Sequence, residues 1–355
     1  MTDLFHFIAL SLLPSWSWLQ TAERLRAGEP PAAVFDRLLA THWSAEPDQR
    51  SALYARAHAA VERARAQRIT PVVWSDAAYP VALTTIVDPP PVLWIHGSTR
   101  AFDAPAVAIV GARAASAYGL SVAEQLAADL AARGLAIISG LARGVDSAAH
   151  RGALSAGGVT VGIMGSGVDV MYPREHAALA RDMQRHGAVV SELVPGTPPM
   201  AQFFPMRNRI ISGLSRAVVV IEAGEKSGSL ITARCALEQG RDVLAVPGNV
   251  LSGRNRGAHA LLKDGAKIVE SADDILEELR MPSVGLGSGL GAPRSAGHDP
   301  ILASLTPGEP SDLDAIAERS GLTTARLLPR LFELELQGAV ARVGGGRFVR
   351  IDRSC

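Results

Sequence analysis

Two arginines flank an asparagine in the segment FFPMRNRIISGLSR, residues 203–216. Proline fits the first position of a helix, so we expect a helix to begin at Pro205. Arg207, Asn208 and Arg209 would then occupy its first turn, where cations oppose the helix dipole. A bound anion explains such cations better than helix stability does. Because guanidinium groups pair with phosphate and carboxylate groups, the segment predicts an anion site.

Further arginines occur in glycine-bearing loops that follow apolar, strand-like runs. In the first loop, GARAASAYG, Gly111 permits a tight turn, Ser116 can cap the next helix and Arg113 adds a guanidinium group. Taken alone, this loop fits an ordinary strand-to-helix turn with an exposed arginine equally well. Two later loops, SGLARGVD and GSGVDVMYPR, repeat the pattern and contribute Gly140, Arg143, Gly165 and Arg174. In the second loop we expect Asp146 to cap the helix that runs through His150.

A fourth loop, EAGEKSGSLIT, offers a lysine, serine hydroxyls and backbone amides to a phosphate, through Lys226, Ser227, Gly228 and Ser229. It lacks the glycine before the lysine and the upstream glycine of a nucleotide-binding P-loop, which excludes that motif. The nearby run SGRNRG adds Arg254 and Arg256 ahead of another helix. The first loop is not GxGxxG, so it does not indicate a dinucleotide.

The charge of the chain is balanced as a whole but not locally. The sequence has 35 Lys+Arg and 35 Asp+Glu, which speaks against a uniformly basic nucleic-acid coat, and 48% hydrophobic residues, which exclude wholesale disorder. Residues 200–260 nevertheless hold eight cations and four anions. Only Lys226, Lys263 and Lys267 are lysines. A GC-rich genome explains that bias, and a need for guanidinium groups at phosphates is the alternative.

Metal chemistry and membrane insertion have little support in the sequence. Cys235 and Cys355 are too few for a disulfide framework or a zinc site, and they fit a reducing cytoplasm. His150 and His176 have no partner at metal-ligand spacing, so we interpret both as surface or packing residues. The apolar N-terminus is interrupted by Pro14 and falls short of the about 20 residues that a membrane span needs. We therefore expect no metal, no cofactor and no membrane insertion.

The loops follow a regular series of expected strands. Apolar, β-rich runs occur at 106–110, 135–139, 159–164, 188–193, 217–222 and 242–246, each followed by a turn and a helical stretch. Continuous apolar strands are buried on both faces of a sheet. The pattern predicts an α/β fold, a doubly wound, Rossmann-like parallel sheet, in which ligands bind at the carboxyl ends of the strands. We expect further short strands near Val72 and Val92.

Composition predicts four segments along the chain. Residues 1–68 have the spacing of short helices, and residues 69–280 would form the Rossmann-like domain. Residues 281–298 are rich in Gly, Ser and Pro and predict a flexible linker. Residues 299–355 predict helix, Gly321 turn, helix and then a hairpin with 344–346 at its tip, which together make a winged helix. This last module has a net charge of −1, so insertion into a major groove is weakly supported.

The motifs together resemble the DNA-processing protein A (DprA/Smf) family. The stretches that carry the resemblance run in family order and include GARAASAYG, SGLARGVDSAAH, FPMRNRIISGLS and EAGEKSGSLIT. The resemblance implies a homodimer, formed through the Rossmann-like domain, that binds single-stranded DNA and loads RecA onto it in natural transformation. It also implies that Arg113, Arg174 and the run 207–209 line the DNA pocket, with Lys226 nearby. Backbone or hydroxyl contacts would come from Ser116, Gly140, Gly228 and Ser229.

Two departures and one alternative accompany this resemblance. The N-terminal segment LPSWS lacks the glycine of a helix–hairpin–helix, so we expect it to be structural or a partner surface. For the winged helix we favour a protein partner over duplex DNA. The alternative function is a nucleotide-processing enzyme, similar to phosphoribohydrolases, that would use Arg113 and Glu222 at the same phosphate pocket. An NAD-dependent dehydrogenase lacks both GxGxxG and a proton-transferring histidine.

Overall fold

The computed structural model describes residues 2–42, 47–251, 253–281, 300–306, 309–336, 339–343 and 347–351. The chain divides into two compact units, residues 1–283 and 284–355. Nearly all of the predicted linker, and the predicted hairpin tip at 344–346, lie outside the described residues. Each unit has hydrophobic core clusters of its own.

The first unit is built on a single mixed sheet with the order β1-β2-β6-β5-β4-β3-β7-β8-β9. The strands from β3 onward pair in parallel, whereas β1 and β2 form an antiparallel hairpin that joins the sheet through β6. This confirms the predicted parallel, Rossmann-like sheet and its six main strands. The bounds are β1 Thr70–Val73, β2 Val92–Gly97, β3 Ala106–Gly111, β4 Ala136–Ser139, β5 Thr160–Ile163, β6 Ala188–Ser191, β7 Ala217–Ile221, β8 Asp242–Ala245 and β9 Lys267–Ile268.

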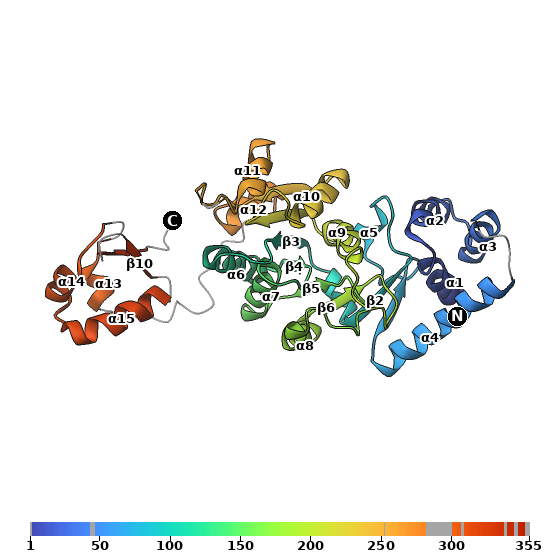
Figure 1. Cartoon of the computed structure of the whole chain (residues 1–355), viewed down its shortest axis with the longest axis horizontal. Helices are drawn as coiled ribbons and strands as arrows, with labels where there is room; N and C mark the ends of the chain where they lie inside the picture. Colours follow the sequence, from blue (N-terminus) through green and yellow to red (C-terminus); the bar gives the residue numbers. More distant parts are fainter. Residues whose placement is uncertain are drawn as a thin grey trace. The chain divides into compact units, whose positions relative to one another are not determined.

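Helices cover both faces of this sheet (Figure 1). Their bounds are α5 Val81–Thr84, α6 Ala117–Ala132, α7 Val145–Ser155, α8 Ala177–His186, α9 Phe203–Gly213, α10 Ser229–Glu238, α11 Arg256–Lys263 and α12 Ala272–Glu278. Successive strand residues point to opposite faces. Val107 and Ile109 of β3 therefore pack with α6, α7 and α12, whereas Ala108 and Val110 pack with α5, α9, α10 and α11.

The N-terminal helices are α1 Thr2–Ser11, α2 Trp18–Arg26, α3 Pro31–His42 and α4 Pro47–Ala66. Phe7 and Ile8 of α1 and Ala57 of α4 lie in one buried cluster with Trp94 of β2 and Val189 of β6. The N-terminal helices therefore share a hydrophobic core with the edge of the sheet. The predicted domain boundary between residues 68 and 69 stays a prediction.

The second unit has the order α13 Pro300–Ser304, α14 Leu313–Ser320, α15 Thr324–Leu336, β10 Val340–Val343 and β11 Arg347–Arg350. The two strands pair antiparallel, which confirms the predicted helix–turn–helix with a hairpin. Gly321 ends α14 with a φ of +68°, a left-handed conformation that glycine adopts without strain. Ile316, Leu327 and Leu331 form a buried core of their own with Phe348 of β11.

Two details of the predicted helix starts are wrong. Helix α9 begins at Phe203, so Pro205 is its third residue and the run 207–209 lies in its second turn. Helix α7 begins after Gly144, and the Asp146 carboxylate does not cap it. It instead accepts hydrogen bonds from the backbone N–H groups of Gly140 (3.1 Å) and Ala142 (3.4 Å) in the preceding loop. The predicted cap of α6 is confirmed, because Ser116 Oγ accepts from Gly119 N–H at 3.1 Å.

Candidate functional site

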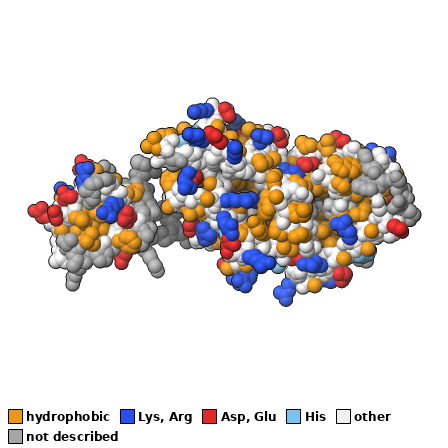
Figure 2. Space-filling view, viewed as in Figure 1, with side chains coloured by type: hydrophobic (Ala, Val, Ile, Leu, Met, Phe, Trp, Pro, Cys, Tyr) orange, Lys and Arg blue, Asp and Glu red, His pale blue; other side chains and the backbone are white. Residues whose placement is uncertain are grey.

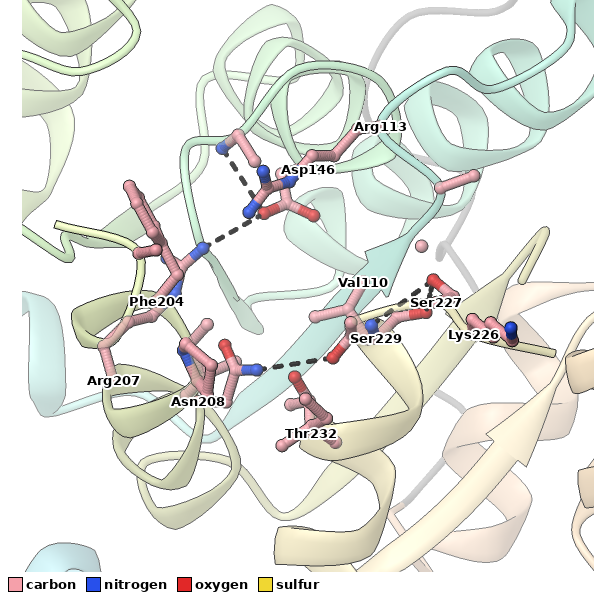
Figure 3. A pocket seen from close by; sticks show the side chains of 18 of the residues that line it. Val110, Arg113, Asp146, Phe204, Arg207, Asn208, Lys226, Ser227, Ser229 and Thr232 are labelled. Carbon is pink, nitrogen blue, oxygen red and sulfur yellow. Dashed lines mark hydrogen bonds and ion pairs between the residues drawn. The ribbon is translucent and has the colours of Figure 1, made fainter. Parts of the chain in front are cut away.

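A cavity of about 850 Å³ opens at the carboxyl ends of β3 and β7 (Figure 3). After β3 the chain continues to α6 on one face of the sheet, and after β7 it continues to α10 on the other. Adjacent strands whose connections diverge in this way form the switch point at which doubly wound folds bind ligands. We call it the switch-point cavity. Its lining includes Gly111, Arg113, Asp146, Tyr172, Phe204, Arg207, Asn208, Lys226, Ser227, Gly228, Ser229 and Thr232.

Arg113 stands at the rim of this cavity beside two aromatic rings. Its guanidinium carbon lies 5.4 Å from the centre of the Phe204 ring, and the Phe204 and Tyr172 rings are 5.4 Å apart, centre to centre. A cation over a ring face is held without losing its hydrogen-bond donors. Arg113 and Tyr172 are both exposed, so an anion and a planar group can reach them from solvent.

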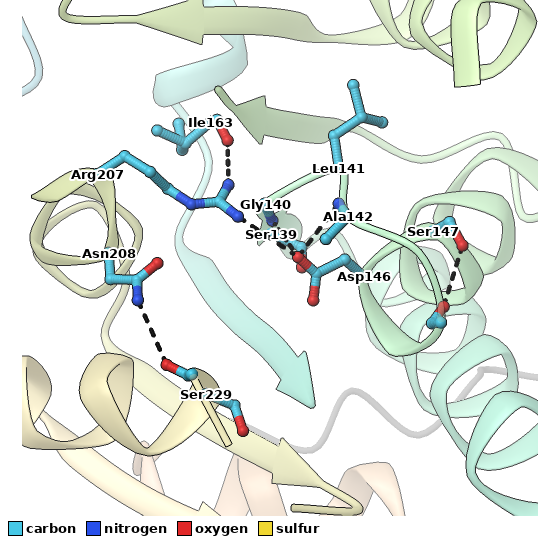
Figure 4. Close-up of polar contacts among 12 residues, drawn as sticks. Ser139, Gly140, Leu141, Ala142, Asp146, Ser147, Ile163, Arg207, Asn208 and Ser229 are labelled. Atoms are coloured by element: carbon cyan, nitrogen blue, oxygen red, sulfur yellow. Dashed lines mark hydrogen bonds and ion pairs between the residues drawn. The ribbon is translucent and has the colours of Figure 1, made fainter. Parts of the chain in front are cut away.

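Arg207 forms the floor of the cavity and is only 5% exposed (Figure 4). Its Nη1 donates to the carbonyl oxygen of Ile163, and its Nη2 lies 3.9 Å from Asp146 Oδ2. Its Nε is buried and has no hydrogen-bond partner among the described residues. Burial lowers the pKa of Arg207 to about 10, against the opposing effect of Asp146. The guanidinium group therefore still carries its charge at neutral pH.

Two neighbours, a glycine and a buried carboxylate, fix the position of this guanidinium group. A Cβ on Gly140 would lie 2.1 Å from both Nη atoms of Arg207, so only glycine lets the group lie against the backbone there. Burial raises the pKa of Asp146, while the Arg207 charge and two backbone N–H groups oppose that shift. Sequence reasoning assigned Asp146 to a helix cap. Its isolated position in a glycine loop gave no indication of the arginine 61 residues later in the chain.

The opposite wall of the cavity is the start of α10. Asn208 Nδ2 donates to the carbonyl oxygen of Gly228 at 3.3 Å, and the Ser227 and Ser229 hydroxyl oxygens lie 2.7 Å apart. The dipole of α10 favours a negative charge at this end, although the N–H groups of Ser229, Leu230 and Ile231 already donate to Ser227 and Gly228. Lys226 is exposed just before this helix and makes no ion pair with another described residue. Thr232, one turn into α10, also lines the cavity and was not predicted.

Other predicted site residues lie around rather than inside the switch-point cavity. Gly140, Arg143 and Gly165 line a smaller adjoining cavity that shares Arg113 and Arg207. Arg143 is ion-paired with Glu175 on the surface. Ser116 and Arg254 line a third cavity. Two predicted residues, Arg174 and Arg256, line none of these three cavities. Arg174 is exposed, and Arg256 lies 3.5 Å from Glu225.

Arg209 does not reach the cavity, contrary to the sequence expectation. It is buried on the other side of α9, where it pairs with Glu192 and lies 3.2 Å from Asp88. Its guanidinium carbon is 4.8 Å from the Trp18 ring centre. Residues two positions apart in a helix point about 200° apart around its axis, so Arg207 and Arg209 face opposite sides of α9. Arg209 ties α9 to the N-terminal helices.

The enzyme alternative required Arg113 and Glu222 at one phosphate. The structure does not bring them to one cavity, since Arg113 lines the switch-point cavity and Glu222 lines the third cavity. Both Glu222 carboxylate oxygens accept from Ser116 N–H, at 3.0 and 3.1 Å. Of the two interpretations that the sequence leaves for His150, surface or packing, the structure supports packing, because His150 is fully buried beside Thr160. Among the described residues, no cluster of three metal-ligating side chains occurs.

Lys and Arg side chains lie over the middle of the face shown in Figure 2, with few acidic side chains among them. No helix in the described parts of the chain is long and apolar enough to cross a membrane. A Rossmann-like sheet with a cationic cavity at its switch point, joined to a winged helix, defines a class of proteins that bind phosphate-bearing ligands.

The chain belongs to the DNA recombination-mediator protein A family. The model of that family matches residues 70–280, and the DprA winged helix domain matches residues 289–346. Protein Smf of Escherichia coli is 42% identical over 289 residues, which are 78% of this chain and 76% of Smf.

Two solved structures resemble the chain. DNA processing protein A (DprA) from Streptococcus pneumoniae matches with a TM-score of 0.66 at 36% identity, over 77% of this chain and 95% of that one. DNA processing protein A from Helicobacter pylori, in a study of its single-stranded DNA binding mode, matches with a TM-score of 0.55 at 28% identity. That match covers 60% of this chain and 97% of the Helicobacter chain. The resemblance found from the motifs is thereby confirmed.

Proposed function

We propose that the chain binds single-stranded DNA in the switch-point cavity. The observation that carries the proposal is the convergence of Arg113, the buried Arg207, Lys226 and the start of α10 on one cavity. Such donors suit a phosphate backbone, and the Tyr172 and Phe204 rings can stack with a base. The single-stranded DNA binding mode described for the Helicobacter relative supports the same ligand.

Fluorescence anisotropy with labelled oligo-dT tests this proposal. Arg113→Ala and Lys226→Ala each remove an exposed cation at the cavity, so we expect affinity to fall by about 1–3 kcal/mol without loss of folding. Arg185→Ala is the matched control, because Arg185 is an exposed arginine on α8 whose one ion pair with a described residue is with Asp182 of its own helix. Unchanged affinity in both cavity variants at moderate salt would contradict the proposal.

We further propose that the bound strand is delivered to RecA, in the cytoplasm, during natural transformation. Membership of a recombination-mediator family supports this role. The one described cysteine, Cys235, is free, as expected in a reducing compartment. Strand exchange by RecA on protein-coated DNA should start faster when the wild-type protein is added, and Arg113→Ala should remove that effect. A mediator without chemistry of its own should release no free base from nucleoside monophosphates.

We infer a homodimer through the Rossmann-like domain. Leu237 of α10 is 61% exposed and Ile268 of β9 is 55% exposed, and both belong to the β8–β9 end of the sheet. Large apolar side chains exposed on a short edge strand and its neighbouring helix favour a covered surface. Leu237→Glu with Ile268→Glu should shift the protein to monomers in sedimentation, whereas Val81→Glu, at an exposed position of α5, should not. A wild-type monomer would contradict the inference.

For the winged helix we propose a protein partner. Leu328 and Phe332 are exposed one turn apart on α15, the second helix of the helix–turn–helix. Glu333 and Glu335 lie on the same helix and would repel phosphates. Duplex DNA binding by residues in this unit, lost on Phe332→Ala, would contradict a protein partner.

A further inference from the structure

The third cavity, which Ser116 and Arg254 line, has a volume of about 600 Å³ and lies beside the switch-point cavity. We call it the Tyr118 cavity. It is lined by Ser116, Tyr118, Glu222, Pro247, Gly248, Asn249, Arg254 and Asn255. Gly224 lines the switch-point cavity, and a Cβ on it would sit 4.0 Å from the carbonyl oxygen of Arg254. One stretch of backbone therefore separates the two cavities.

The carboxylate in the Tyr118 cavity is already occupied by protein donors. Glu222 is 3% exposed and accepts from the Ser116 N–H and hydroxyl groups. Arg254 lies 3.7 Å from Glu222 Oε1. Gly119 makes room for this arrangement, because a Cβ there would lie 2.5 Å from Glu222 Oε2. The Glu222 carboxylate thus fixes the start of α6 at the wall of the cavity. Its negative charge is already compensated by protein donors, so it does not repel a phosphate strongly.

Asn255 supplies a buried amide at the wall of this cavity. It is 5% exposed and precedes α11, but its side chain does not cap that helix. Among the described residues, its amide makes no hydrogen bond, although it packs against Gly248. His259 fixes the neighbouring turn through contacts with the Gly248 backbone at 3.1 and 3.4 Å. An amide that lines a cavity offers both a donor and an acceptor, which match the edge of a nucleobase.

Tyr118 and Arg254 complete the cavity with a ring and a cation. The Tyr118 ring is 53% exposed, and its hydroxyl donates to the carbonyl oxygen of Pro247 at 3.2 Å. This bond holds the ring across the mouth between α6 and the β8–α11 loop. The Arg254 side chain is 56% exposed, although one of its nitrogens donates to the Ala114 carbonyl oxygen at 3.0 Å. A base can stack on the ring while its phosphate meets the guanidinium group.

We propose that the Tyr118 cavity binds a nucleotide of the same single strand that occupies the switch-point cavity. Its base packs on Tyr118 and faces Asn255, and its phosphate meets Arg254. This inference rests on the proposed function. It extends the binding site from the switch-point cavity, past the backbone at Gly224, into the Tyr118 cavity. A short oligonucleotide fills the switch-point cavity alone, whereas a longer one reaches both cavities.

Oligo-dT of about 6 and about 20 nucleotides, compared by anisotropy, tests the proposal. Tyr118→Ala and Arg254→Ala should bind the short strand like wild type and the long strand about tenfold more weakly. Tyr118→Phe keeps the ring but loses its bond to Pro247, so its loss of affinity for the long strand should be smaller than that of Tyr118→Ala. Arg185→Ala is the surface control, and thermal melting of each variant verifies folding.

The remaining outcomes overturn the proposal. If Tyr118→Ala and Arg254→Ala leave the affinity for the long strand unchanged, or lower the affinity for both strands equally, the long strand does not bind in the Tyr118 cavity. If deoxyadenosine monophosphate saturates the wild type but not Tyr118→Ala, while the long strand binds both equally, the cavity takes a free nucleotide instead. If the wild type binds neither strand, the proposed function itself fails, and that result is distinct because it needs no variant.

Discussion

Arg207 shows what one residue contributes at the switch point. A buried guanidinium group loses its hydration, and a single carboxylate at 3.9 Å with one carbonyl acceptor offsets only part of that loss. Its buried Nε without a partner adds to the cost. Charged groups held at such a cost occur mainly at functional sites. A phosphate at the cavity would supply the missing negative charge.

We expect Arg207→Ala to destabilise the protein as well as to weaken DNA binding. Removing the guanidinium group leaves Asp146 buried without its counter-charge, and breaking a buried pair costs about 3–5 kcal/mol. The burial of Arg207 is not visible in the sequence, which by itself indicates only a loss of anion binding. Urea denaturation measures the change, and exposed Arg113→Ala, expected within about 0.5 kcal/mol of wild type, is its control. Equal stability of the two variants would contradict the buried pair.

A single residue, His150, makes the stability of the protein depend on pH. Thr160 Oγ donates to the Ile137 carbonyl oxygen, so it accepts from His150 Nδ1 at 2.7 Å, while Leu141 N–H donates to Nε2 at 3.3 Å. The ring is therefore neutral, and burial lowers the pKa of His150 from 6.5 to about 3. Unfolded chains bind more protons between these two values, so stability is complete above pH 6.5 and falls as the pH drops towards 3.

The expected slope is at most about 1.4 kcal/mol per pH unit in the free energy of unfolding. Urea denaturation at several pH values measures it. His150→Asn removes the titrating group and should flatten the dependence by that amount. Asp146, whose raised pKa acts in the opposite sense, is present in both proteins and cancels in the comparison. Parallel curves for the two proteins would show that the ring is not held neutral.

At the scale of elements, α6 is fixed at its start by one serine with two roles. Ser116 accepts from Gly119 N–H and donates to Glu222, which joins α6 to the end of β7. Ser116→Ala removes the cap and one Glu222 donor, so we expect a loss of about 1–2 kcal/mol in stability. Ser121→Ala, on the exposed side of the same helix, should change stability little. Chemical denaturation compares them, and equal stabilities would exclude the double role.

The elements themselves were largely predictable from the sequence. Buried parallel strands such as β3 and β7 need continuous apolar runs, and those runs are visible without a structure. The start of α9 was missed because Pro205 is tolerated throughout a first turn, not only at its first position. Because the helix starts two residues earlier, Arg207 and Arg209 lie in its second turn, where both are buried and have separate partners.

Partners distant in sequence explain the rest of the site that was not foreseen. Asp146 and Arg207 meet because β4 ends and α9 begins at the same edge of the sheet, and Glu222 reaches Ser116 because β7 lies beside β3. Loop motifs identify which residues can bind an anion. They do not tell which cavity each residue faces, so Ser116 and Arg254 were grouped with a cavity that they do not line.

At the scale of the whole molecule, the formal net charge of zero affects which DNA the protein attracts. All residues of the two proposed DNA cavities belong to the first unit, while the winged helix carries a net charge of −1. A neutral molecule attracts duplex DNA weakly over long range, so its affinity must come from short-range contacts in the cavities. Of the eight cations at 200–260, Arg207, Lys226 and Arg254 line the two cavities, so phosphate binding is concentrated there instead of being spread over the surface.

This confinement predicts a modest salt dependence. If about four phosphates are neutralised, the logarithm of the association constant for oligo-dT should fall against the logarithm of salt concentration with a slope of roughly −3. Arg113→Ala removes one phosphate contact and should lower the magnitude of that slope by about 0.7. Anisotropy titrations across a range of salt concentrations measure both slopes, with Arg185→Ala expected to match wild type. A slope near zero would exclude phosphate contacts, whereas one of about −10 would require a basic surface far larger than the two cavities provide.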